Sequence, residues 1–224
     1  MELNEATLQI LKNFASINSN IVIDEGNTIK TISEAKNILS EATIEESIPQ
    51  RFGVYDLNEF LGVLGLVDKP SLKFSENYAT INDSTGRSKV KYFFSDTEML
   101  TSPTKTITMP EADVTFTLDN DTLNKIRRAA GALGHNEMVI SPSGGAVSLT
   151  VTSSENSTAN TFSIDVDGTA NVDKYNFIFN ISNLKMLSGD YHVEISKKLI
   201  SKFSNLENSI NYWIALEKTS TYGV

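Results

Sequence analysis

Two stretches of the chain place apolar residues at the three- and four-residue spacing of an amphipathic helix. In the stretch from Leu118 to Leu133, Asp119 or Asn120 can cap the first turn. The earlier stretch runs from Leu3 to Ile17. The spacing therefore predicts two helices that each bury one face, with these apolar positions: Leu123, Ile126, Ala129, Ala130 and Leu133 in the later stretch, and Leu3, Ile10, Leu11, Phe14 and Ile17 in the earlier one.

The segments that follow these helices also resemble each other. FGVYDLNEFLGVLGLVDKPSLKFS, which begins at Phe52, parallels YNFIFNISNLKMLSGDYHVEIS, which begins at Tyr175. In both, a strand leads into a short amphipathic helix, expected at about 56–67 and at 182–187, and then into another strand. A repeated order of elements indicates a repeated structural unit. We therefore predict an α+β protein of two similar domains, each with two helices on one face of a mostly antiparallel β-structure.

Alternating apolar residues and turn signals predict strands throughout both halves. A less regular segment, 95–110, separates the halves and holds two of the five prolines. We predict an N-terminal domain at 1–95, an extended connector at 96–112 and a C-terminal domain at 113–224. The apolar connector residues are expected to bury against the C-terminal domain. The predicted strands are 21–23, 28–33, 38–48 (an edge strand), 51–55, 72–74, 78–82, 89–94, 114–118, 137–141, 146–152, 161–166, 175–179 and three closing strands that end at 216.

The composition limits the class of protein. The 224 residues carry a net charge of −9 and include no cysteine, which excludes disulfides and thiolate metal sites and fits a reducing compartment. The N-terminus lacks the pattern of a secretory signal, and no run of 18 apolar residues predicts a membrane span. The acidic balance argues against a protein that coats nucleic acid with its whole surface, but it allows one basic face.

Such a face is present on the later helix. Lys125, Arg127 and Arg128 fall within four residues, on the side opposite the apolar stripe. A solvated helix face is the simpler interpretation of this pattern, and a surface that binds an anionic polymer is the alternative.

Candidates for catalysis are few. His135 and His192 are the only histidines, and no common catalytic or phosphate-binding motif occurs. Asp165 and Asp167 faintly suggest a calcium turn, but a plain turn is the better interpretation because the later acids of the EF-hand pattern are missing. We expect no catalytic site, no metal site and no cofactor.

Several segments in the right order carry a resemblance to a known family. The segments ILKNFASINSNIV, VYDLNEFLGVLGLV, LNKIRRAAGAL and FIFNISNLKMLSGDYHV span most of the chain. Together they resemble the DNA polymerase sliding clamps, or processivity factors, of T-even-type bacteriophages. The resemblance implies two clamp domains per chain and a homotrimeric ring, with helices lining a central hole and antiparallel sheets outside.

The resemblance also implies which residues face double-stranded DNA, without sequence preference. On the polar sides of the helices these are Lys12, Lys125, Arg127, Arg128 and Lys185. The N-terminal helices are only weakly basic, since Glu5 accompanies Lys12 and the helix from Asp56 carries Glu59.

Further partners implied by the family are the replicative polymerase and an ATP-dependent clamp loader, in the cytoplasm of an infected bacterial host. A polymerase peptide would bind an apolar pocket beside the connector, with Leu100, Ile107, Met109 and Pro110 as candidates. Equally, these residues could only pin the connector to its own domain. Two alternatives to a non-enzymatic clamp remain: a ring-forming phage structural protein without DNA-tethering activity, and an enzyme whose site has no recognisable pattern.

Overall fold

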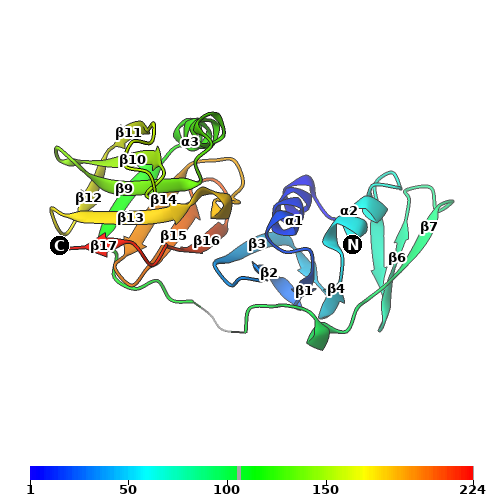
Figure 1. The fold of residues 1–224 in the computed structure, drawn as a ribbon. Coiled ribbons are helices and arrows are strands. Elements are labelled where there is room, and N and C mark those ends of the chain that lie inside the picture. Colours follow the sequence, from blue (N-terminus) through cyan, green and yellow to red (C-terminus); the bar gives the residue numbers. More distant parts are fainter. Residues whose placement is uncertain (105–106, 224) are drawn as a thin grey trace. The chain divides into compact units, whose positions relative to one another are not determined.

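The chain forms two compact units, Met1–Thr106 and Ile107–Val224. The structure, a computed structural model, describes residues 1–104 and 107–223. Lys105 and Thr106, which fall in the predicted connector, lie outside the described residues. Each unit combines helical segments with antiparallel strands (Figure 1). The predicted α+β class with two similar domains is confirmed.

Two α-helices belong to the N-terminal unit. Helix α1 (Glu5–Ile17) begins two residues later than predicted, because the side chain of Asn4 caps it and accepts a hydrogen bond from Thr7 N at 2.7 Å. Helix α2 (Leu57–Leu64) begins after Asp56, whose carboxylate accepts hydrogen bonds from Asn58 N and Glu59 N in the first turn. Their buried faces follow the predicted spacing: Ile10, Leu11, Phe14 and Ile17 in α1, and Leu57, Phe60 and Leu64 in α2.

The strands of the N-terminal unit are all paired antiparallel. β1 pairs with β4, β2 pairs with β3, and β5, β6 and β7 form a three-stranded sheet in that order. A single 3₁₀ turn, η1 (Thr97–Met99), lies in the predicted connector. The strand bounds are β1 Ile21–Ile23, β2 Gly26–Ile32, β3 Ile38–Ile48, β4 Phe52–Val54, β5 Ser71–Phe74, β6 Tyr78–Asn82 and β7 Lys89–Phe93.

The C-terminal unit packs α3 (Asn120–Leu133) against antiparallel strands that run in two orders, β11-β10-β9-β13-β17 and β12-β8-β14-β15-β16. Apolar side chains between these strands form its core, including Phe177, Phe203 and Tyr212. The bounds are β8 Val114–Leu118, β9 Glu137–Ser143, β10 Ala146–Thr152, β11 Phe162–Val166, β12 Gly168–Ala170, β13 Tyr175–Asn180, β14 Tyr191–Ser196, β15 Ile200–Asn205, β16 Ile210–Ala215 and β17 Thr221–Tyr222.

Strand β12 was not predicted, and a glycine makes it possible. Gly168 sits opposite Phe116 of β8. A Cβ at Gly168 would lie only 2.7 Å from both the Thr115 carbonyl oxygen and Val147 Cγ2. The short strand can therefore approach β8 only because residue 168 has no side chain.

The prediction of a helix at 182–187 was wrong. The structure has a single 3₁₀ turn, η2 (Ile181–Asn183), and at Leu184 the backbone leaves the helical region with φ −78° and ψ 50°. Leu184 and Met186 are both buried while Lys185 between them is exposed, and residues 184–187 form neither helix nor strand. The C-terminal unit therefore has one α-helix where two helices were expected.

Candidate nucleic-acid interface

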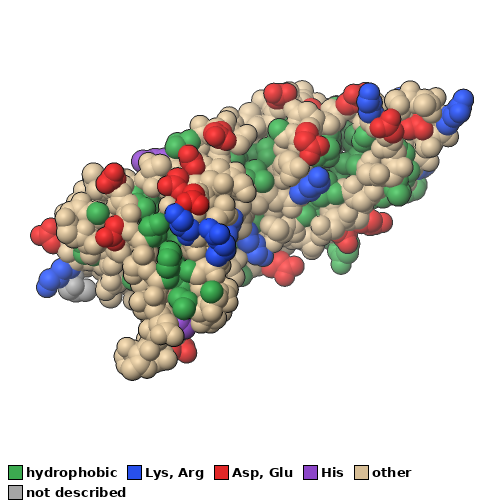
Figure 2. All heavy atoms as spheres, turned by 90° about the horizontal axis from the view of Figure 1, so that it is seen from above, with side chains coloured by type: hydrophobic (Ala, Val, Ile, Leu, Met, Phe, Trp, Pro, Cys, Tyr) green, Lys and Arg blue, Asp and Glu red, His purple; other side chains and the backbone are tan. Residues whose placement is uncertain are grey.

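Helix α3 presents the basic face that the sequence predicts. The Asp119 carboxylate caps it by accepting a hydrogen bond from Thr122 N at 2.6 Å, and Gly134 ends it in the left-handed conformation at φ 69°. Leu123 and Ile126 are fully buried beneath it. Seen from the helix side, Lys and Arg side chains gather over this unit, with acidic side chains close by (Figure 2). The helix thus has a buried apolar side and a charged side.

Lys125 is the first basic residue of this face, and it has an acidic partner one turn away. Its Nζ lies 2.6 Å from Asp121 Oδ2, and both side chains are largely exposed, at 43% and 69%. The hydrogen bond and the charge of Lys125 hold the pKa of Asp121 below its usual value. An exposed pair of this kind contributes little to stability. Lys125 can therefore exchange Asp121 for another anion at small cost.

Arg128 is exposed and, among the described residues, forms no ion pair within bonding distance. Together with Asp121, Asn124 and Arg127 it lines a wide, open groove of about 510 Å³ along α3. A long, exposed guanidinium beside an open surface depression suits a phosphate, because its planar set of donors matches phosphate oxygens.

Arg127 lies differently from the expected solvent-facing orientation. Its guanidinium is half-buried, and Nη2 donates to the carbonyl oxygens of Leu184 at 2.7 Å and Met186 at 3.2 Å. Burial lowers the pKa of Arg127, although an arginine remains charged at any physiological pH. Its charge therefore remains part of the basic face, while Nη2 is bound to the protein itself.

The two other predicted DNA-facing residues are exposed. Lys185 lies in the segment that Arg127 holds, so the structure brings it alongside α3. Lys12 lies on α1 of the N-terminal unit, where Gln9 donates to the Glu5 carboxylate on the same polar side. Helix α2 exposes Glu59. The N-terminal helices therefore carry one lysine against two glutamates and add no net positive charge.

The candidates for a peptide pocket divide between the two units. Leu100 is buried in the N-terminal unit, where its Cδ1 would lie 2.7 Å from a Cβ placed on Gly53. This differs from the expectation that it buries against the C-terminal domain. Ile107, Met109 and Pro110 belong to the C-terminal unit and are half-buried.

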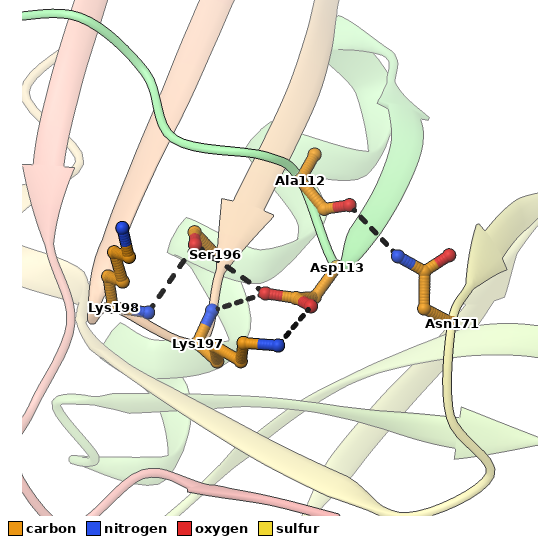
Figure 3. Close-up of polar contacts among 6 residues, drawn as sticks. All are labelled: Ala112, Asp113, Asn171, Ser196, Lys197 and Lys198. Carbon is orange, nitrogen blue, oxygen red and sulfur yellow. Dashed lines mark hydrogen bonds and ion pairs between the residues drawn. The ribbon is translucent and has the colours of Figure 1, made fainter.

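A buried carboxylate that the sequence does not reveal anchors the start of β8. The carboxylate of Asp113 accepts hydrogen bonds from Lys197 N at 2.7 Å and from Ser196 Oγ at 3.5 Å, and Lys197 Nζ lies 3.6 Å away (Figure 3). Burial opposes its charge, but these bonds, the Tyr222 hydroxyl and the Lys197 charge outweigh burial and lower the pKa of Asp113. On the other side, Asn171 N donates to the Asp113 carbonyl oxygen and Asn171 Nδ2 donates to the Ala112 carbonyl oxygen. Asp113 thus joins the end of the connector to the β14–β15 turn and the C-terminal strand.

The structure brings the two histidines into no common site. His135 follows α3 and its Nε2 lies 3.0 Å from the Asn160 carbonyl oxygen, while His192 lies on β14. Within residues 1–104 and 107–223, no three His, Asp or Glu side chains are grouped to hold a metal ion. No helix in these ranges is long and apolar enough to cross a bilayer.

Comparison with known proteins places both units in one family. The family described as "DNA polymerase processivity factor" matches residues 4–109, and "gp45 sliding clamp, C terminal" matches residues 115–218. The sliding clamp of Vibrio phage KVP40 is 34% identical over 223 residues, which cover 97% of this chain and 99% of that protein. The sliding clamp of Enterobacteria phage T4 is 30% identical over 229 residues, with 99% of each chain covered.

Solved structures share the fold at low sequence identity. The structure of A. fulgidus PCNA bound to the C-terminal region of FEN-1 aligns over 98% of both chains, with a TM-score of 0.71 and 12% identity. Proliferating Cellular Nuclear Antigen from Entamoeba histolytica aligns over 94% of both chains, with a TM-score of 0.67 and 14% identity.

Proposed function

The chain belongs to the sliding clamps that act as DNA polymerase processivity factors, and from this premise we propose that three copies close into a ring around duplex DNA. The observation that supports encirclement most directly is the charged side of α3 on a chain of net charge −9. Contacts from lysine and arginine to phosphates carry no sequence information, so a ring that uses them can slide. Retention then comes from encirclement, while the acidic remainder of the surface discourages binding to DNA from outside.

Two unpaired strand edges support ring closure. β7 pairs only with β6, and β11 pairs only with β10, so among the described strands each leaves a free edge. β7 exposes Lys89, Lys91 and Phe93. β11 and the residue after it expose Asp165 and Asp167.

The free edge of β7 is basic and the free edge of β11 is acidic. This complementarity favours pairing of the two edges between different copies of the chain. Because the two edges belong to different units of the chain, β7 of one copy would pair with β11 of the next. Such an interface is head-to-tail and can close into a ring.

The partners proposed for this ring are duplex DNA, the replicative polymerase and an ATP-dependent loader that opens it, in the cytoplasm of the infected bacterium. A. fulgidus PCNA binds the C-terminal region of FEN-1, which supports a peptide as the means of attachment. Ile107, Met109 and Pro110 remain our candidates for contacts with such a peptide. The proposed role is mechanical, and we propose no catalytic step.

Retention on DNA of two topologies tests this proposal. The protein would be loaded onto a nicked circle, and half of the sample would then be cut once with a restriction enzyme. We expect the protein to remain on the circle and to leave the cut molecule by sliding off its ends. A conventional DNA-binding protein would stay on both, and a ring-forming structural protein would load on neither. Either result would contradict the proposal.

A further inference from the structure

The segment between η2 and β14 carries one of the predicted DNA-facing lysines in a fixed pattern of exposure. Leu184 and Met186 are 3% and 5% exposed, whereas Lys185 between them is exposed. The segment is not helical, since Leu184 has φ −78° and ψ 50°. The position of Lys185 therefore depends on how the backbone of its two neighbours is held.

Arg127 holds the backbone on both sides of Lys185. Its Nη2 donates to the carbonyl oxygen of the residue before, at 2.7 Å, and of the residue after, at 3.2 Å. An Nη group has two N–H bonds, so this nitrogen is fully used within the protein. Hydrogen bonds from a charged donor are stronger than neutral ones, and the half-buried position shields them from water.

The rest of the same segment is also attached. Leu187 N donates to Tyr212 Oη at 3.1 Å, and Tyr191 Oη donates to the Leu187 carbonyl oxygen at 2.7 Å. Further along, Gly189 N donates to Asn120 Oδ1 at 3.1 Å. The segment is thus bound to the first turn of α3 at one end and to the core at its middle, and Arg127 completes the attachment at Lys185.

We propose that Arg127 is a positioning residue, which fixes Lys185 alongside α3 so that DNA meets a fixed set of charges. Among the described residues no carboxylate forms an ion pair with Arg127, and its guanidinium donates to the two carbonyl oxygens instead. The inference rests on the proposed clamp function and deepens it, since it divides the basic residues into those that contact phosphate and one that acts through another.

Limited proteolysis tests the positioning without DNA. Trypsin cleaves after lysine, so the rate of cleavage between Lys185 and Met186 reports how firmly this backbone is held. Arg127→Lys keeps the charge and the number of trypsin sites but loses the planar guanidinium. Loss of one charge-assisted bond should raise this cleavage rate about tenfold. Arg128→Lys is the matched control and should leave the rate unchanged; equal rates in the two variants would overturn the proposal.

A double-mutant cycle tests the link to DNA. Loading of wild type, Arg127→Lys, Lys185→Gln and the double variant would be measured as a function of salt, after each folded state is checked by its melting temperature. If Arg127 acts through Lys185, the double variant should load no worse than Lys185→Gln alone. Independent contacts would instead give effects that multiply, which would refute the positioning role.

The control cycle combines Arg128→Gln with Lys185→Gln, whose effects should multiply because the two residues act separately. Failure of the wild-type protein to stay on a nicked circle would count against the clamp function itself. A wild-type ring that is retained, with multiplying effects at Arg127 and Lys185, would count only against this inference.

Discussion

Arg127 and Arg128 are neighbours in the sequence, but their guanidinium groups have different surroundings. Arg128 is exposed at an open groove, whereas Arg127 donates to carbonyl oxygens 57 and 59 residues further along the chain. Helical spacing predicts that both lie on the side of α3 opposite the apolar stripe. The spacing carries no information about carbonyl groups so distant in sequence, so it could not separate the two roles.

Lys125 is a contrasting case at the same scale. Its partner Asp121 lies four residues earlier, a spacing that brings side chains together on any α-helix. A contact of this kind follows from the sequence spacing alone. Local partners are predictable in this way, and partners from other elements are not.

The buried carboxylate of Asp113 leads to a prediction about pH. Because the folded-state pKa of Asp113 is below the ordinary 3.8, its contribution to stability is complete above that pH and is lost as the pH falls through the folded-state value. Asp113→Asn should lower the free energy of unfolding by about 2 kcal/mol at neutral pH. The difference from wild type should shrink below pH 3.8, as measured by urea denaturation across this range.

Asp173→Asn serves as the control for this measurement, because it makes the same change of charge at an exposed position of the same unit. A constant difference between Asp113→Asn and wild type down to strongly acid pH would contradict the assignment of the effect to the ionised carboxylate.

At the scale of elements, the helices with strong local signals were predicted correctly, whereas the weaker helix predicted at 182–187 is absent from the structure. α1 and α3 have long apolar faces and capping side chains, and α2 follows the cap residue Asp56. The sequence at 182–187 also suggests a helix, because Leu184, Met186 and Leu187 are all apolar. Their positions fit the spacing of a helix as well as that of a non-helical segment. Contacts with Arg127 and Tyr212 hold the backbone in a non-helical conformation, and no local pattern encodes those contacts.

The free edges of β7 and β11 give a prediction about assembly. Lys89→Glu with Lys91→Glu would place like charges opposite Asp165 and Asp167 in the proposed interface. We expect this double variant to be a monomer of 24.6 kDa, where three wild-type copies make a particle of about 74 kDa. Light scattering at equal protein concentration measures the difference.

Reversal of the acidic edge supplies the control. Asp165→Lys with Asp167→Lys should also give monomers, and a mixture of the two reversed variants should associate because the charges are again opposite. If the Lys89→Glu, Lys91→Glu variant keeps the wild-type mass, another surface closes the ring.

For the whole molecule, the repeated order of elements indicated two similar units before any contact was known. The boundary was harder to predict, because the connector residues divide between the units: Leu100 buries beside Gly53 in the first, whereas Ile107 belongs to the second. The basic residues on α3 were found from charge and spacing alone. The anchoring of Lys185 and the buried Asp113 could not be, since both depend on which strands become neighbours.

Retention by encirclement gives a prediction that no affinity measurement would give. Heparin, a polyanion, should block loading when it is added first, because it occupies the basic residues needed for the first contact with DNA. Added after loading, it should leave the protein on a nicked circle, since release then requires the ring to open. Prompt release from the circle by heparin would indicate ordinary binding. The order of addition is the control.

If Lys125 contacts phosphates as we propose, its ion pair with Asp121 has a consequence for movement along a duplex. An ammonium group that leaves one phosphate has, at 2.6 Å, an acid from its own helix to return to. The ammonium charge is therefore never left without a partner between one phosphate and the next, which lowers the energy barrier to sliding. Asp121 thus competes with phosphate for Lys125, which weakens each contact with DNA slightly and speeds the dissociation of that contact.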